Sequence, residues 1–260
     1  MLKKKIIIAN WKMGPDSIKE ATGFVSQIFK KIYFLKNKPK IVICPPLPYI
    51  SEIKKNVSSN KNNDLNIGAQ DCFYEDKGPF TGEISSLSLK SLGVKYITIG
   101  HHERRLRGET NEIVNKKLKN LLKNGFTGIL CVGEIEKDET GNYLKFIEEE
   151  IRECLKSIQK NYLKNIIVAY QPISNLLNEN KNLLHTHEIK QISIFIKKIL
   201  VEICGREIGL EIPIVYGGNF DKKNFEFFFL ESGTDGLLTE KDVFKKDKFL
   251  ELIKLFDNVK

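Results

Sequence analysis

The chain has 260 residues, a formal net charge of +9 and five cysteines, and 41% of its residues are hydrophobic. A chain of this length can bury a sizeable core as one α/β barrel or as two smaller domains. It contains no apolar run near the ~20 residues that cross a bilayer, and its basic residues are mostly scattered lysines without a recognition motif, so neither a membrane-spanning nor a nucleic-acid-binding protein is expected.

The cysteines are widely spaced and odd in number, and no two of them form a Cys-x-x-Cys pair. This spacing is not that of a metal centre, a redox centre or a disulfide framework. The N-terminus leads into a short Ile-rich strand instead of a signal peptide. We therefore expect a cytoplasmic protein, or one from an organellar stroma if a leader was removed before residue 1.

Eight short runs rich in Ile, Val and Leu recur along the chain, and each is followed by a segment with helical apolar spacing. Short apolar runs bounded by Gly, Pro or Asn are typical of strands buried in a parallel sheet. The predicted strands are residues 5–9, 41–44, 65–70, 96–99, 128–132, 166–170, 212–216 and 236–238. The predicted helices are residues 18–34, 49–57, 85–92, 109–124, 144–158, 187–203, 224–229 and 243–256.

This alternation decides the fold class. Eight βα units in roughly 250 residues predict an α/β protein of the (β/α)8 barrel type, with residues 1–260 forming a single domain. A doubly wound sheet would need fewer units and a Gly-rich turn after its first strand, where this chain has Asn10-Trp11-Lys12. In a (β/α)8 barrel the active residues lie in the loops that follow the strands.

The fourth predicted strand ends at Gly100 and is followed by five ionisable residues, 101–105. His101 and Glu103 are therefore candidates for an active site at the carboxyl end of that strand. Taken alone, such residues are more often a solvated charge cluster that opens a helix, so the interpretation depends on the residues of the other loops.

Seven loop motifs, in order and in register, resemble those of the triosephosphate isomerase family. They are Ala9-Asn10-Trp11-Lys12-Met13, Gly68-Ala69-Gln70-Asp71, Thr81-Gly82-Glu83-Ile84-Ser85, Ile99-Gly100-His101-His102-Glu103-Arg104-Arg105, Cys131-Val132-Gly133-Glu134, Ala169-Tyr170-Gln171-Pro172 and Tyr216-Gly217-Gly218. The resemblance runs from about residue 5 to 240 and marks a divergent member. It implies the interconversion of dihydroxyacetone phosphate and glyceraldehyde 3-phosphate, a step of glycolysis and gluconeogenesis, through an enediolate and without cofactor or metal.

The resemblance also implies roles for four residues in the first half of the site. Lys12 would be the cation that stabilises the enediolate, and Asn10 would orient the reacting groups. His101 would donate a hydrogen bond to the substrate oxygens, and Glu103 would pair with Lys12 and hold it in place. These roles are physically sound, because a fixed cation and an aimed donor act where negative charge develops.

The resemblance breaks at the position of the catalytic base. The sixth predicted strand is followed by Gln171, where the family has the glutamate that removes the substrate proton. An amide oxygen has no useful basicity, and a positioned general base commonly contributes ~10²–10⁴ in rate. Gln171 is therefore expected to keep the shape of the site but not to remove the substrate proton.

The phosphate-binding part of the site is also changed. The resemblance assigns this part to Gly217, Gly218, Asn219, Glu240 and Lys241. Asn219 replaces a serine, and the Glu240-Lys241 pair replaces two glycines whose bare amides cradle the phosphate. A carboxylate at that place is expected to oppose a dianionic ligand.

Further departures affect the lid and the start of one helix. In the lid, residues 173–181, Leu177 and Glu179 occupy glycine positions, and their side chains are expected to hinder closure. His102 stands where the family usually has serine, and it is expected to cap the helix that follows. His185 and His187 are interpreted as cap and surface residues, because no carboxylate or Cys at matching spacing completes a metal site.

Three functions remain open at this point. The first is triose phosphate isomerisation that is impaired because Gln171 replaces the base. The second is a weak or inactive paralogue kept for binding, regulation or assembly. The third is an isomerase for a different carbonyl substrate, with or without a phosphate, and with Glu179 or Glu240 as the base. Full ordinary activity would require Gln171 to be bypassed.

The resemblance also implies a homodimer. In the family, the third loop reaches into a neighbouring subunit, and here this loop keeps Phe73, Tyr74 and Thr81. Exposed aromatic side chains in such a loop mark interfaces. The expected partners are therefore a second copy of the chain and a small carbonyl compound such as a triose phosphate.

Overall fold

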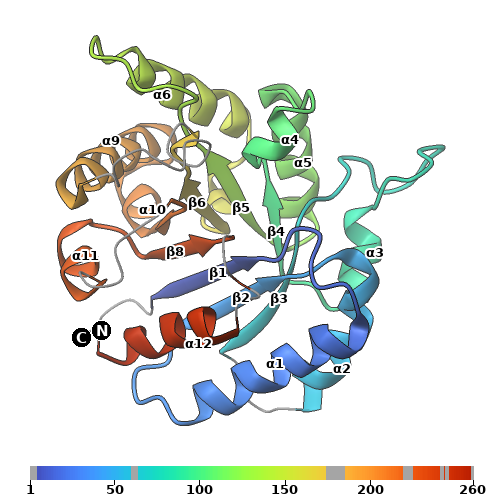
Figure 1. The fold of residues 1–260 in the computed structure, drawn as a ribbon. Helices are drawn as coiled ribbons and strands as arrows, with labels where there is room; N and C mark the ends of the chain where they lie inside the picture. The colour runs from blue at the N-terminus through green and yellow to red at the C-terminus, as the bar shows by residue number, and fades with distance from the viewer. Residues whose placement is uncertain are drawn as a thin grey trace.

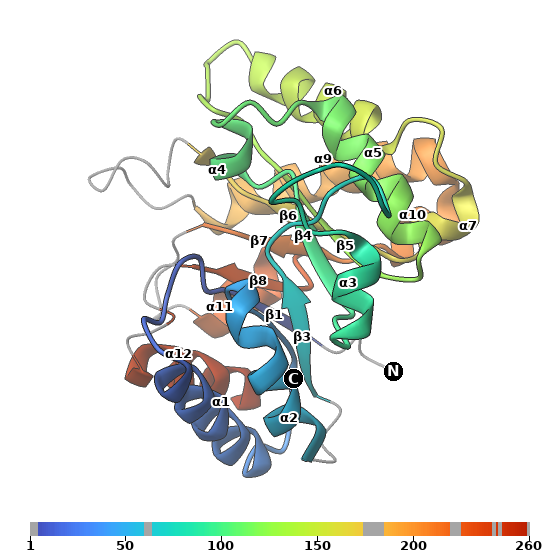
Figure 2. The same cartoon turned by 90° about the vertical axis from the view of Figure 1, so that its right-hand side faces the viewer.

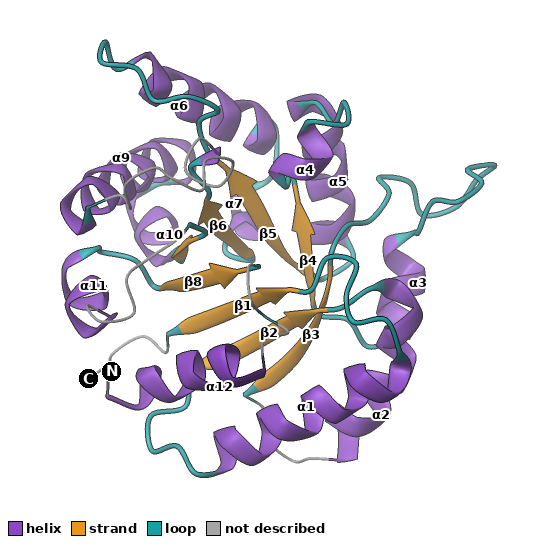
Figure 3. Ribbon diagram, viewed as in Figure 1, coloured by secondary structure: helices purple, strands orange, loops and turns teal. Residues whose placement is uncertain are grey.

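Eight parallel strands form a closed barrel, with the helices on its outside (Figures 1 and 3). The computed structural model describes residues 5–59, 64–173, 185–218, 225–240, 243 and 246–258. The strands are β1 Ile6–Asn10, β2 Lys40–Cys44, β3 Leu65–Ala69, β4 Tyr96–Ile99, β5 Thr127–Val132, β6 Ile166–Tyr170, β7 Ile214–Tyr216 and β8 Gly236–Thr239. The ring is closed by pairing between β1 and β8, with Ile7 opposite Leu237. The predicted (β/α)8 fold is confirmed.

Helices alternate with these strands as predicted, with ends shifted by a few residues. They are η1 Leu47–Tyr49, α1 Ile18–Tyr33, α2 Ile50–Ser59, α3 Ser86–Ser91, α5 Asn111–Lys123, α6 Asn142–Leu155, α9 Thr186–Cys204, α11 Phe225–Glu231 and α12 Lys246–Leu255. Helix α1 lies between α2 and α12 on the outside of the barrel (Figure 2). In the part of the chain that the structure describes, no helix combines the length and apolarity needed to cross a membrane.

Four short helical segments have no predicted range of their own. They are α4 His102–Arg105, α7 Lys160–Leu163, α10 Arg206–Glu211 and η3 Phe256–Asn258. Each has six residues or fewer, which is too short for the apolar periodicity of a helix to show in the sequence. Of these, α4 matters most for function, because it follows β4 directly.

The strands carry two separate layers of apolar side chains. In β1, Ile7 and Ala9 pack in the core shared with the helices, whereas Ile6 and Ile8 pack in a second core made only of strand residues. The second core comprises Ile6, Ile8, Val42, Cys44, Tyr96, Ile129, Cys131, Ile167, Ala169, Val215 and Leu238. Side chains alternate between the two faces of a strand. The inward-facing side chains of a strand, which we call its inner row, therefore lead along the strand toward the mouth of the barrel.

Candidate active site

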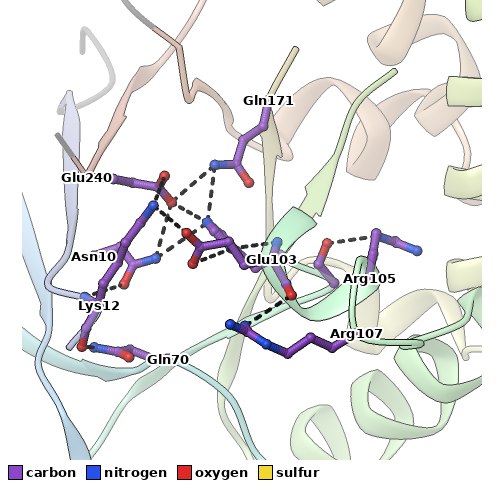
Figure 4. A network of polar contacts seen from close by, with 10 residues as sticks. Asn10, Lys12, Gln70, Glu103, Arg105, Arg107, Gln171 and Glu240 are labelled. Atoms are coloured by element: carbon purple, nitrogen blue, oxygen red, sulfur yellow. Dashed lines mark hydrogen bonds and ion pairs between the residues drawn. The ribbon is translucent and has the colours of Figure 1, made fainter. Parts of the chain in front are cut away.

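Five polar side chains meet at the carboxyl ends of the strands (Figure 4). Asn10, Gln171 and Glu240 continue the inner rows of β1, β6 and β8, two residues beyond Ile8, Ala169 and Leu238. Lys12 and His101 follow the ends of β1 and β4. The structure therefore brings together residues that the sequence places in four different loops.

The backbone of Lys12 is strained and held in place. Its φ is 49°, in the left-handed region that non-glycine residues rarely adopt, and such a conformation costs about 1–3 kcal/mol. The Lys12 N–H donates to Asn10 Oδ1 at 3.0 Å, and Gln70 Nε2 donates to the Lys12 carbonyl at 2.7 Å. Gln70 was not singled out from the sequence as a site residue, although it lies two residues beyond Gly68 on β3.

The Lys12 ammonium lies between two carboxylates. Its Nζ is 2.8 Å from Glu103 Oε1 and 3.1 Å from Glu240 Oε2, so the pairing with Glu103 is present. Burial lowers the pKa of Lys12, but the charges and hydrogen bonds of Glu240 and Glu103 outweigh it and raise the pKa overall. Lys12 is therefore a cation at neutral pH.

His101 is positioned by a turn that glycine makes possible. Gly100 has a φ of +68°, and a Cβ there would lie 3.2 Å from the Cys131 carbonyl. The turn makes His101 the N-cap of α4, with Nδ1 accepting from the Glu103 N–H at 3.3 Å and Nε2 contacting Glu240. The expectation that His102 caps this helix is wrong, because His102 is its first residue.

His102 packs beneath the site. Its ring lies against His101, with 4.3 Å between the ring centroids, and only 6% of the residue is exposed. Its Nδ1 is buried without a hydrogen-bond partner among the described residues. Burial lowers the pKa of His102, so the ring is neutral at neutral pH.

Gln171 is held between two glycines. A Cβ at Gly133 would lie 1.8 Å from the Gln171 carbonyl oxygen, and one at Gly217 would lie 2.6 Å from Gln171 Cγ. Its amide nitrogen is 3.5 Å from His101 Nε2 and 3.3 Å from Glu240 Oε1, while its Oε1 is buried without a partner among the described residues. The amide therefore faces the reacting centre of the site.

Glu240 occupies the centre of the cluster. Its Oε1 accepts from Asn10 Nδ2 at 3.2 Å and contacts His101 Nε2, and its Oε2 pairs with Lys12. Position 240, which the resemblance assigns to the phosphate-binding part of the site, continues the inner row of β8, and its side chain points into the mouth of the barrel beside His101. The role of Glu240 in phosphate binding stays a prediction. Asn219, Lys241 and the lid residues 174–181, with Leu177 and Glu179, lie outside the described residues.

The contacts of Glu240 predict a pH-dependent stability. Burial raises the pKa of Glu240, but hydrogen bonding to His101 and the nearby positive charge lower it from 4.5 to about 2. A lowered pKa contributes stability above pH 4.5, which is lost as the pH falls toward 2. We expect the stability difference between the wild type and Glu240→Gln to shrink by on the order of 2 kcal/mol between pH 6 and pH 3. Urea unfolding at both pH values measures it, and a difference independent of pH would contradict it.

The arrangement can stabilise a negative charge but has no strong base in the described residues around it. Lys12 and His101 supply a cation and a hydrogen-bond donor at one point, as stabilisation of an enediolate requires. The two nearby carboxylates are already engaged, Glu240 by Lys12 and His101 and Glu103 by Lys12. The family model described as "Triosephosphate isomerase" matches residues 5–256, a span that contains all of these residues.

Proposed function

This chain belongs to the triosephosphate isomerase family, and from that premise we propose that it isomerises triose phosphates, or a closely related carbonyl compound, at a strongly reduced rate. Charge stabilisation by Lys12 and His101 is retained, whereas proton removal is impaired. The observation that carries this proposal is the amide of Gln171, which faces His101 at 3.5 Å in the position of the family's base.

In the proposed reaction the substrate takes the place that the Glu240 carboxylate fills in the free protein. The carbonyl oxygen would accept from His101 Nε2 and lie beside Lys12, and both groups would stabilise the enediolate. The proton on the adjacent carbon would then have to go to a group other than the Gln171 amide, which has no useful basicity. Glu240 loses its partners on substrate binding, so its pKa would rise toward 4.5 and make it the nearest available acceptor.

A coupled isomerase assay tests the proposal. We expect the wild type to turn over triose phosphate slowly but above the uncatalysed rate, and Lys12→Met to lower this rate by about 10²–10³-fold, the usual effect of removing a charge-stabilising group. Lys55→Met, at an exposed lysine paired with Glu52, is the control and should leave the rate unchanged. Turnover that is absent, or that survives Lys12→Met, would contradict the proposal.

The position of Glu240 favours a second candidate, an isomerase for a non-phosphorylated carbonyl substrate with Glu240 as the base. Its carboxylate would oppose a dianion yet lies beside the electrophile His101. Under this candidate, phosphoglycolate will not raise the Tm of the protein. Under the first candidate it will, because a ligand that binds only the folded state stabilises it.

We further infer a homodimer formed through the loop between β3 and α3. This loop projects away from the barrel (Figure 1) and packs Phe73 against Tyr74 and Phe80, with ring centroids 4.1 and 4.6 Å apart. Phe80 is 39% exposed. Such an exposed aromatic cluster supports an interface between copies of the chain.

Replacement of Thr81 by arginine tests the dimer. Thr81 is exposed in this loop, and a buried, unpaired guanidinium in an interface is strongly unfavourable. We expect sedimentation equilibrium at micromolar concentration to give a dimer for the wild type and the 29.9 kDa monomer for Thr81→Arg. Thr140→Arg, at an exposed threonine before α6, should remain dimeric. A wild type that sediments only as a monomer would reject the inference.

A further inference from the structure

His101, His102 and Glu240 form a compact set of potential metal ligands. One ligand atom from each residue lies within 4.8 Å of the other two. The two histidines are 3% and 6% exposed, and the Glu240 side chain is 9% exposed. Buried groups of this kind differ from the acidic clusters common on protein surfaces, because burial requires that each polar atom has a partner.

Two polar atoms, one within this set and one beside it, have no such partner. His102 Nδ1 and Gln171 Oε1 are both buried without a hydrogen bond among the described residues. An unpaired buried polar group costs about 1–3 kcal/mol. Both atoms belong to residue types that bind metals, an imidazole and an amide.

Gln171 can supply its oxygen to the same point. Its amide nitrogen lies 3.3 Å from Glu240 Oε1 and 3.5 Å from His101 Nε2. A half-turn of the amide would put the oxygen there, and the oxygen would give up no hydrogen bond within the described residues. Ligand atoms that share a tetrahedral metal at about 2.0–2.2 Å lie about 3.3–3.6 Å apart, close to these separations.

We propose that His101, His102 and Glu240 bind a divalent first-row transition metal such as zinc, with the Gln171 oxygen as a fourth ligand. Two imidazoles and a carboxylate suit zinc, cobalt or iron better than calcium or magnesium, which prefer oxygen ligands alone. A metal bound here could polarise a carbonyl oxygen as a Lewis acid. The proposal goes beyond the isomerase function and does not depend on it.

The neighbouring charges are compatible with an added cation. Lys12 contacts Glu240 through Oε2, and its other partner is Glu103, so Glu240 Oε1 remains the atom that contacts His101. On binding, the metal would replace the proton on His101 Nε2. The ring proton would then be on His101 Nδ1, which lies 3.7 Å from Glu103 Oε2 and could donate to this carboxylate. In exchange, Nδ1 would no longer accept the 3.3 Å hydrogen bond from the Glu103 N–H.

The test measures metal binding by the full chain. The protein carries no histidine tag, and a chelator first removes any metal bound to it. Equilibrium dialysis against zinc chloride, followed by metal analysis, should give one zinc per chain. Cobalt(II) should give visible d–d absorption without a thiolate charge-transfer band, because none of the five cysteines is a proposed ligand. His102→Ser and Glu240→Gln should each weaken zinc binding at least about 10-fold, the lower end for loss of a group that supports a metal site.

The chain offers a matched control in its other two histidines. His185 and His187 are exposed at the start of α9 and stack on each other, with 5.6 Å between their ring centroids. The His185→Ala, His187→Ala double variant should bind zinc as the wild type does. The proposal is overturned if the wild type binds less than one zinc in ten chains, if binding survives both His102→Ser and Glu240→Gln, or if only the control variant loses it. Circular dichroism on each variant verifies the fold, and catalysis is not used as a readout.

Discussion

The Gln171→Glu, Glu240→Gly double variant is expected to isomerise triose phosphate about 10²–10⁴-fold faster than the wild type, the usual contribution of a positioned general base. The first substitution returns a carboxylate to the position beside His101. The second removes the carboxylate that fills the centre of the site and gives the residue that the family has there. The coupled assay measures kcat and KM for both proteins.

Gln171→Glu alone should gain less than the double variant. The Gln171 amide nitrogen lies 3.3 Å from Glu240 Oε1, and two carboxylates at such a distance cannot both ionise freely, so one of them keeps a raised pKa. Glu240→Gly alone is the control, since it empties the site without supplying a base. If Glu240→Gly alone were as fast as the double variant, the missing base would not be what limits the wild type.

Lys117→Met is expected to lower the free energy of unfolding by about 3–5 kcal/mol, the usual effect of removing one partner of a buried ion pair. Lys117 is 3% exposed on α5, and its Nζ is 2.7 Å from Asp71 Oδ1 and also contacts Glu109. Methionine fills similar space but leaves both carboxylates without their cation. Because Asp71 lies in the loop after β3, this substitution should also loosen the loop proposed to form the dimer.

Urea unfolding of Lys116→Met provides the comparison. Lys116 is the preceding residue of the same helix and pairs with Glu112, but it is exposed, and exposed ion pairs contribute little. We expect its unfolding midpoint to stay close to that of the wild type. Equal destabilisation by both substitutions would show that the loss arises from the helix and not from the buried ion pair.

Much of the fold could be predicted from the sequence, because the apolar runs and the helical periodicity are strong. Strand β6 begins and ends at the predicted residues, 166 and 170, and the closed barrel agrees with the count of eight units. No bounds were predicted for the short helix α4, and its cap is His101 in place of the expected His102. A helix of one turn depends on a local cap and not on a periodic pattern.

The site could be predicted in part. The ion pair of Lys12 with Glu103 follows from the resemblance, and Gln70 could have been found from the alternation of inward and outward residues in β3. The contact between Glu240 and His101 could not, because these residues are 139 positions apart and meet only when β8 closes against β1. The predictions for the lid and for Asn219 and Lys241 remain predictions.

Deuterium exchange measures directly the step that Gln171 is proposed to impair, the removal of a proton from the substrate carbon. Dihydroxyacetone phosphate incubated with the wild type in D₂O gains deuterium at its hydroxymethyl carbon only if the protein removes the proton there. Nuclear magnetic resonance should show incorporation at least about 100-fold slower for the wild type than for the Gln171→Glu, Glu240→Gly double variant. Equal rates in the two proteins would contradict the conclusion that an amide at position 171 leaves this site without an effective base.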